Sequence, residues 1–144
     1  VGEFGWNSTN DNLKLQTYIE KNPIYWLKYQ PKNIVSDLIS SARLLIYPSF
    51  YEGFGLPPLE SIRSNTPVLS SNIPTLKEVL KDYVIYAENG KVETFTNAMN
   101  YMSTLPKNIN PNLFRAQKYS NKFTWEKCVN NTIKIHHKNF ILHS

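Results

Sequence analysis

The chain has 144 residues, a formal net charge of +5 and 41% hydrophobic residues, which is the profile of one soluble globular domain. Its longest apolar stretches, such as residues 44–47, are far shorter than the roughly 20 residues that a helix needs to span a bilayer. The N-terminus has neither the basic nor the apolar region of a signal peptide. We therefore expect no membrane span and no leader, and the positive charge favours anionic partners without selecting one.

The cysteine and histidine content limits the chemistry further. A single cysteine, Cys128, cannot form an internal disulfide, which fits a reducing, cytoplasmic compartment, and we expect it to be a small buried hydrophobe. The adjacent His136 and His137 leave a helix in different directions, and His143 lies about two turns beyond His136. No carboxylate or cysteine completes a ligand set, so we expect no metal site.

Amphipathic stretches alternate with short apolar runs along the chain. In chain order the pattern predicts a helix over 10–20, a strand over 24–27, a helix over 34–42, a fully buried strand over 43–47, a helix over 56–64, a strand over 67–70, a helix over 75–80, a strand over 83–86, a helix over 92–105, and two closing helices over 112–122 and 124–140, the last with Thr124 as N-cap.

Strands that alternate with helices of this length favour an α/β fold, in which a parallel sheet is covered by helices on both faces. Ligands of such folds bind at the carboxyl ends of the strands. The loop after Tyr47 is the most informative of these ends, because it follows the most convincing buried strand and opens a helix. It is therefore the first place to look for a functional site.

Glycines and a proline shape this loop. Gly53 and Gly55 allow backbone amides to approach a ligand without a Cβ in the way, and Pro57 fits the first helical position, where its missing N–H costs nothing. The positive end of the helix dipole then favours an anion. Its donors would be the free amides of Gly53, Phe54, Gly55 and Leu56.

Two carboxylates bracket the glycines. Glu52 precedes them, and Glu60 follows in the first turns of the helix. Carboxylates are poor neighbours for phosphate but good acceptors for the hydrogen bonds of vicinal hydroxyls. A ligand with phosphates in its middle and hydroxyl-rich sugars at both ends suits such a loop, and a nucleotide diphosphate sugar is that kind of molecule.

The segment as a whole resembles the donor-site signature of glycosyltransferase family 4, the retaining group 1 enzymes with the GT-B fold. Pro48-Ser49 followed by Glu52 and Glu60 is similar to the family's Pro-Ser and Glu-x7-Glu motif, and residues 67–71 take the place of its later G-x-P-V-V-A-S element. Fainter likenesses follow in the family's order at residues 2–6, 34–49, 74–79 and 123–125.

The resemblance implies a three-layer, Rossmann-like half of a GT-B fold, a single domain over residues 1–144 that is truncated at its N-terminus and lacks the acceptor-binding domain. It implies that Glu60 accepts hydrogen bonds from the ribose and that Glu52, the catalytic carboxylate, contacts the donor sugar. The amides of residues 53–56 would hold sugar or pyrophosphate oxygens, and the base would lie near Tyr29. The donor would be a UDP- or GDP-hexose, with no metal or other cofactor.

One missing feature and two residues, Asn65 and Arg63, depart from the family pattern. The family's basic pair, an Arg and a Lys that neutralise the departing pyrophosphate, lies upstream of residue 1 and has no match here. Arg43 stands at the start of a strand, at the wrong edge for that role. Asn65 replaces the usual glycine, and because Asn tolerates left-handed backbone we expect the turn to survive. Arg63 stands where a small residue is usual, which bears on helix packing.

The leading interpretation is the donor-binding half of a retaining enzyme that transfers a hexose to a glycan or lipid-linked acceptor in glycan, lipopolysaccharide or glycolipid synthesis, in contact with an anionic inner membrane face. A catalytically silent nucleotide-sugar-binding module or partner subunit is the alternative, because no basic pair is present. A sugar-nucleotide epimerase shares the fold, but the Glu-x7-Glu spacing argues against it. Nucleic-acid binding fits a pI near 9.3, and aromatic side chains can stack on unpaired bases. We expect Trp26, Tyr47 and Trp125 to pack in the core instead, because they fall inside predicted strands and a helix.

Overall fold

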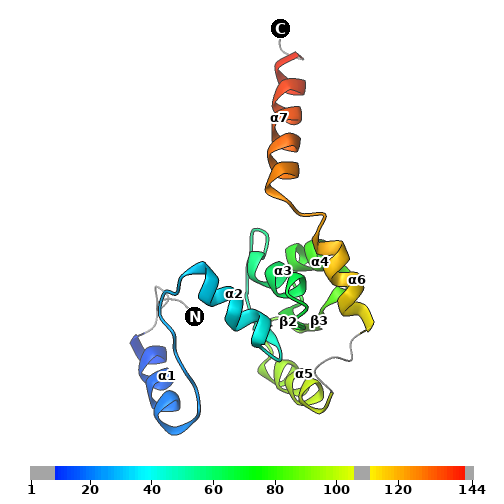
Figure 1. The fold of residues 1–144 in the computed structure, drawn as a ribbon. Helices are drawn as coiled ribbons and strands as arrows, with labels where there is room; N and C mark the ends of the chain where they lie inside the picture. The colour runs from blue at the N-terminus through cyan, green and yellow to red at the C-terminus, as the bar shows by residue number, and fades with distance from the viewer. Residues whose placement is uncertain (1–8, 106–110, 142–144) are drawn as a thin grey trace. The chain divides into compact units, whose positions relative to one another are not determined.

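The computed structural model describes residues 9–105 and 111–141 (Figure 1). The chain divides into two units, Val1–Leu38 and Ile39–Ser144. The first contains helix α1 (Thr9–Lys21) and the start of helix α2 (Lys32–Ser41). Side chains tie the last turns of α1 to its own backbone, because the Asn22 amide donates a hydrogen bond to Tyr18 O at 2.9 Å.

The second unit is an α/β domain. Its described residues form a parallel three-stranded sheet in the order β1-β2-β3, in which Leu45 pairs with Val68 and Leu69 pairs with Ile85. The elements that follow α2 are β1 (Leu45–Tyr47), α3 (Leu56–Arg63), β2 (Val68–Ser71), α4 (Pro74–Leu80), the 3-10 turn η1 (Lys81–Tyr83), β3 (Ile85–Ala87), α5 (Val92–Thr104), α6 (Pro111–Ser120) and α7 (Trp125–Ile141).

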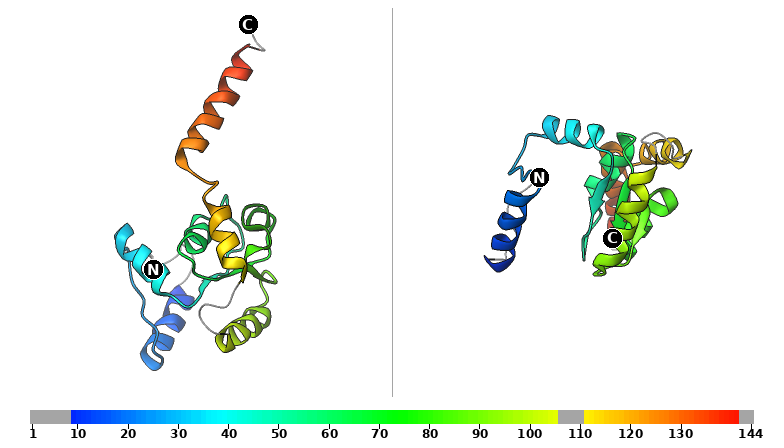
Figure 2. Two further views of the ribbon diagram at one scale, coloured as in Figure 1. Left: turned by 45° about the vertical axis from the view of Figure 1, so that its right-hand side comes forward. Right: turned by 90° about the horizontal axis from the view of Figure 1, so that it is seen from below.

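Strand β2 lies at the centre of this domain, and all four of its residues are buried. Helices α3 and α4 lie on one face of the sheet and α5 on the other (Figures 1 and 2). Alternate side chains of β1 accordingly serve different faces: Leu45 and Tyr47 pack on the core that α3 and α4 share, whereas Ile46 lines an apolar groove with Phe95 of α5. This layering confirms the predicted α/β fold. The buried core consists of Ile62, Val68, Ile73, Leu76, Val79, Leu80 and Ala116.

The turn between α3 and β2 accommodates two unusual residues. Asn65 has a φ of 59°, so it adopts the left-handed backbone conformation that was expected of it. Arg63 donates hydrogen bonds from Nη2 to Ser120 O at 3.0 Å and Phe123 O at 2.8 Å. Its long side chain therefore caps the carboxyl end of α6 and ties α3 to that helix.

One predicted strand is absent and the bounds of the others shift: β1 begins at Leu45, two residues later than predicted, and β2 lies one residue later than predicted. Residues 24–27 form no strand, because the described part of the first unit offers no second strand to pair with and an unpaired strand leaves its backbone groups unsatisfied. Strand β3 begins at Ile85, two residues later than predicted, because residues 81–83 form the 3-10 turn.

Several apolar side chains that the pattern places in the core are exposed. Strand β1 lies at an edge of the described sheet, so Ile46 is 38% exposed and the strand is not fully buried. Cys128 is exposed, and Trp125 is 75% exposed, because the described side chains of α7 are uncovered. Thr124 is the predicted N-cap of α7, since its Oγ1 accepts a hydrogen bond from Lys127 N at 3.2 Å. Neither α7 nor another helix in the described ranges is long and apolar enough to cross a membrane.

Candidate functional site

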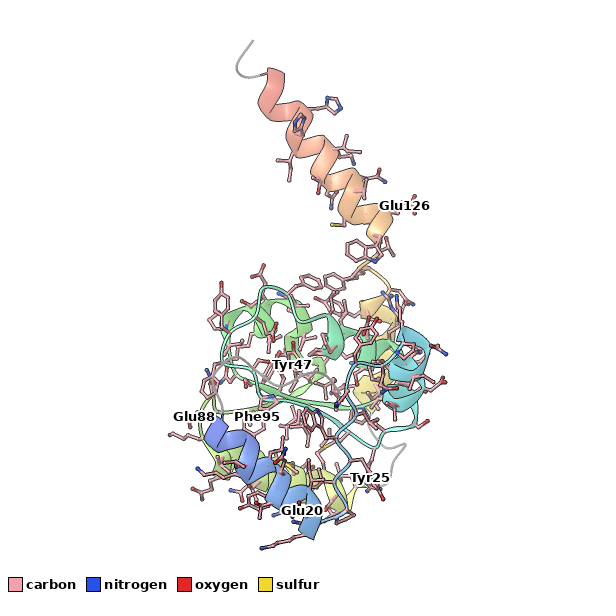
Figure 3. The ribbon with its side chains drawn as sticks, turned by 90° about the vertical axis from the view of Figure 1, so that its left-hand side faces the viewer. Glu20, Tyr25, Tyr47, Glu88, Phe95 and Glu126 are labelled. Atoms are coloured by element: carbon pink, nitrogen blue, oxygen red, sulfur yellow. The ribbon has the colours of Figure 1, made fainter. Side chains whose placement is uncertain are left out.

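The loop of residues 48–55 joins the carboxyl end of β1 to α3, the position where open parallel sheets bind ligands. Tyr47 ends β1, and its hydroxyl donates a hydrogen bond to Glu52 Oε1 at 2.6 Å. Both side chains are half-buried, and Figure 3 shows Tyr47 among the side chains of the α/β domain. The first of the two predicted carboxylates is therefore fastened to the end of the strand.

The environment of Tyr47 keeps its hydroxyl protonated. Burial, and after it the hydrogen bond and negative charge of Glu52, raise the pKa of Tyr47 to about 12, against an opposing hydrogen bond with Ser49. Because a phenolate beside a carboxylate is disfavoured, Tyr47 remains a hydrogen-bond donor at neutral pH. One oxygen of Glu52 is thus occupied by Tyr47, and no further described residue donates to the carboxylate.

Gly55 ends the loop in a conformation that only glycine fits well. Its φ is 85° and its ψ 59°, and a Cβ built on it would lie 2.5 Å from Leu76 Cδ2 in α4. Both the left-handed backbone and the contact with Leu76 exclude a larger residue. The tight approach of the loop to α4 therefore depends on this glycine.

The start of α3 leaves backbone donors uncovered. Leu56 is the first helical residue, so Pro57 is at the second position rather than the predicted first, and Pro58 follows it. The prolines lack N–H groups, and the Leu59 N–H is bonded to Gly55 O at 3.4 Å. The N–H groups of residues 53–56 donate to no described acceptor. The four predicted anion-binding amides are therefore free at the positive end of α3.

Aromatic side chains hold the middle of the loop. The Phe54 ring meets the Phe123 ring edge to face, with centroids 5.6 Å apart, and Phe123 in turn contacts Tyr119 with centroids 5.4 Å apart. Arg63 fixes the backbone of Phe123 through the hydrogen bond described above. The loop is thus supported at three points, by Tyr47, by Leu76 and by the segment that follows α6.

Glu60, the second predicted carboxylate, lies on α3 and is exposed. No described basic side chain forms an ion pair with either Glu52 or Glu60. The loop and the start of α3 therefore combine two carboxylates without protein cations and a set of free amides. Such a site can accept hydrogen bonds from hydroxyls and donate to anionic oxygens.

Comparison with known protein families assigns the chain to one of them. The family described as "Glycosyl transferases group 1" matches residues 2–121. The chain belongs to this family. The membership predicted from the Glu52–Glu60 segment is thereby confirmed, and the α/β domain is consistent with the Rossmann-like half of a GT-B glycosyltransferase.

Curated proteins similar to this chain include several mannosyltransferases. The chain is 33% identical over 115 residues to the O-antigen chain mannosyltransferase B of Escherichia coli, covering 78% of this chain and 30% of that protein. It is 37% identical over 86 residues to the O-antigen chain mannosyltransferase RfbU of Salmonella typhimurium, covering 60% and 24%. The chain therefore spans about a quarter to a third of the length of these relatives.

Two further residues, Tyr29 and Arg43, bear on the predicted donor site. Tyr29 belongs to the first unit and is 79% exposed, whereas the loop belongs to the second, so the proximity of Tyr29 to a nucleobase stays a prediction. Arg43 donates hydrogen bonds from Nη2 to Ser103 O at 2.7 Å and to Leu105 O. Arg43 therefore caps the carboxyl end of α5, in agreement with its exclusion from leaving-group stabilisation.

The sequence pattern did not indicate the roles of two aromatic residues that shape the loop. It indicated Tyr47 only as a packed strand residue and Phe123 only as part of a faint family likeness. A signal for Tyr47 was available, since a buried tyrosine hydroxyl usually needs a partner and Glu52 is the nearest carboxylate in the sequence. No local pattern connects Phe123 with Phe54, because the two residues are far apart in the chain.

The histidines near the end of the chain are the remaining candidates for metal ligands. The rings of His136 and His137 have centroids 6.3 Å apart and an interplanar angle of 89°. His143 lies outside the described residues. Among the described residues, no group of three His, Cys, Asp or Glu side chains could hold a metal ion.

Proposed function

We propose that this chain is the donor-binding domain of a retaining hexosyltransferase, which transfers a sugar from a nucleotide diphosphate to a hydroxyl of a glycan or lipid-linked acceptor. The observation that carries the proposal is the β1–α3 loop, in which two carboxylates without protein cations flank four free amides. The names of the curated relatives support mannose as the hexose and O-antigen polysaccharide as the product. A GDP- or UDP-hexose is the corresponding donor.

Each part of the loop has a role in this proposal. Glu60 accepts hydrogen bonds from the ribose hydroxyls, and Glu52 accepts them from the donor sugar. The amides of residues 53–56 hold the pyrophosphate or sugar oxygens, where the dipole of α3 stabilises the charge that develops as the leaving group departs. Tyr29 lies near the nucleobase. Rate enhancement then comes from positioning and from charge stabilisation, and no metal ion is needed.

The remaining components lie outside these 144 residues in the proposal. A preceding domain binds the acceptor and supplies the basic pair, so that the chain by itself binds the donor with little or no turnover. Two of its arginines are engaged as helix caps, since Arg43 bonds the end of α5 and Arg63 the end of α6. This supports a basic pair from elsewhere. The positive charge favours peripheral contact with an anionic membrane surface on the cytoplasmic side.

Calorimetric titration with GDP-mannose, GDP-glucose, UDP-glucose and UDP-galactose tests the proposal. We expect one of them to bind, and Glu60→Ala to weaken its binding about tenfold or more, because a charged acceptor of ribose hydroxyls is lost. Glu93→Ala is the matched control, since Glu93 is another exposed glutamate in the first turns of a helix. Absence of binding by every donor, or equal binding by both variants, would overturn it.

A non-catalytic nucleotide-sugar-binding subunit is the second candidate, supported by the absence of a basic pair from this chain. Donor turnover by the complete gene product separates the two. If the complete protein hydrolyses or transfers the sugar of the donor that the chain binds, the transferase proposal stands. If the complete protein binds the donor without consuming it in the presence of cell-envelope acceptors, the subunit proposal replaces it.

A further inference from the structure

Tyr47 is the one protein donor to Glu52 among the described residues, and its position is rigid. Its ring packs against the buried core beneath α3 and α4, and its backbone belongs to β1, which pairs with β2 through Tyr47 and Ser70. Glu52, in contrast, lies in a loop segment without regular structure. The 2.6 Å hydrogen bond therefore connects a fixed donor to a carboxylate whose backbone provides little constraint.

This hydrogen bond fixes the orientation of the Glu52 carboxylate. A carboxylate has two oxygens, and each accepts more than one hydrogen bond. Because Tyr47 occupies Oε1, the side-chain torsions of Glu52 are restricted, and Oε2 is left for donors outside the protein. The rotamer entropy that a glutamate otherwise loses when it binds a ligand is already lost in the free protein.

We propose that Tyr47 is a positioning residue that holds the Glu52 carboxylate toward the hydroxyls of the transferred sugar and thereby determines how strongly the site prefers a nucleotide sugar over the bare nucleotide. The inference rests on the proposed function, since it requires that Glu52 meets the sugar. Tyr47 itself does not contact the ligand. Its effect is therefore confined to the sugar and absent from binding of the nucleoside diphosphate.

Tyr86 provides a matched control within the same sheet. Like Tyr47 it is a half-buried strand tyrosine with a pKa raised to about 12, chiefly by burial. Its hydroxyl donates to the backbone carbonyls of Lys81 at 2.8 Å and Leu76 at 3.2 Å, and it bonds no carboxylate. Tyr86→Phe therefore removes a comparable buried hydrogen bond without touching Glu52.

The experiment compares GDP-mannose with GDP, and UDP-glucose with UDP, by calorimetry on the wild type, Tyr47→Phe, Tyr86→Phe, Glu52→Gln and the double variant Tyr47→Phe/Glu52→Gln. We expect Tyr47→Phe to weaken nucleotide-sugar binding about five- to tenfold, the usual cost of a lost hydrogen bond, and to leave nucleoside diphosphate binding unchanged. Tyr86→Phe should change neither. In the Glu52→Gln background, Tyr47→Phe should have a smaller effect, because the neutral amide oxygen accepts a weaker hydrogen bond from Tyr47 than the carboxylate does.

The possible failures are distinguishable. If the wild type binds neither nucleotide sugar nor nucleoside diphosphate, the proposed function falls and the inference falls with it. If the wild type prefers the nucleotide sugar and Glu52→Gln removes that preference while Tyr47→Phe does not, the proposed function stands and the role of Tyr47 is refuted. Equal weakening of both ligands by Tyr47→Phe would also refute it. Should Tyr47→Phe fail to fold by circular dichroism, Tyr47→Met gives the same test, since its flexible apolar side chain fills the core position without a hydroxyl donor and leaves Glu52 intact.

Discussion

The loops that follow β1 and β3 contain similar residues, but the glutamate of each loop has different partners. Each leaves the carboxyl end of a strand, contains a glutamate and reaches a glycine with positive φ, 85° at Gly55 and 76° at Gly90. In the β3 loop the glutamate, Glu88, forms an ion pair with Lys91 at 2.7 Å, and its backbone N–H donates to Thr94 Oγ1 at 3.0 Å. Both the charge of Glu88 and its backbone N–H are therefore satisfied by neighbouring residues of the protein.

The β1 loop leaves both unsatisfied by the described protein. Glu52 receives a neutral donor, Tyr47, and no cation, and the amides of residues 53–56 have no described acceptor. The two loops at this sheet edge therefore differ: Glu88 of the shorter β3 loop is paired by residues of the protein, while Glu52 and the amides of the β1 loop are left for the proposed ligand. Comparing the same substitution in both loops tests this difference.

The largest difference in stability is expected at the glycines. Gly55→Ala should lower the free energy of unfolding by about 3 kcal/mol, because left-handed backbone and a Cβ 2.5 Å from Leu76 Cδ2 both oppose it. Gly90→Ala meets Phe50 Cε1 only at 3.5 Å, an ordinary contact, and should cost about 1 kcal/mol from its backbone alone.

Urea denaturation of the purified variants measures these values. Gly53→Ala is the control within the β1 loop, since its Cβ would meet nothing within 4 Å and its backbone is not left-handed; we expect it to be neutral. Equal losses for Gly55→Ala and Gly90→Ala would show that the contact with Leu76 contributes nothing.

The next effect concerns the titration of Tyr47. Glu52→Gln removes the negative charge beside the phenol, so the pKa of Tyr47 should fall from about 12 toward its ordinary value of 10. Glu88→Gln, in the other loop, should leave it unchanged. Ultraviolet difference titration, with Tyr47→Phe used to assign the signal, measures the shift. An unchanged titration in Glu52→Gln would show that the charge of Glu52 contributes nothing and that burial alone raises the pKa of Tyr47.

The same shift has a consequence for stability at high pH. The folded protein keeps the protons of Tyr47 and Tyr86 up to about pH 12, whereas the unfolded chain loses them near pH 10. The unfolded state therefore binds fewer protons in this window, and stability falls as the pH rises from about 10 to 12. Tyr47→Phe should make that fall shallower in urea denaturation at stepped pH. A slope equal to that of the wild type would show that Tyr47 does not contribute.

The smallest effect is expected from the ion pair of the β3 loop. Glu88 and Lys91 are both exposed, so Lys91→Ala should cost no more than about 0.5 kcal/mol, and less at high salt. Donor binding should be unchanged. A loss of donor binding in this variant would mean that the β3 loop also contacts the ligand and would weaken the distinction between the two loops.

Sequence periodicity predicted most elements of the α/β domain, because it depends on local spacing. The apolar alternation placed all three strands of the described sheet within two residues of their observed bounds, and Pro57 and Gly55 placed the start of α3. The absence of a strand at residues 24–27 and the exposure of the described side chains of α7 could not be predicted in this way. A strand needs a partner strand and an apolar helix face needs a covering element, and neither requirement is written in the local pattern.

Part of the candidate site could likewise be predicted from the sequence, and part could not. Glu52, residues 53–56 and Glu60 resemble the family's donor-site motif, and such a resemblance can be found in the sequence because it depends only on residue types at fixed intervals. Only the tertiary structure decided that Glu52 is paired with Tyr47, that Gly55 is required by Leu76, and that Phe123 supports Phe54. These contacts depend on how α4, the sheet and the segment after α6 pack together, and close packing between distant segments is a property of the folded chain alone.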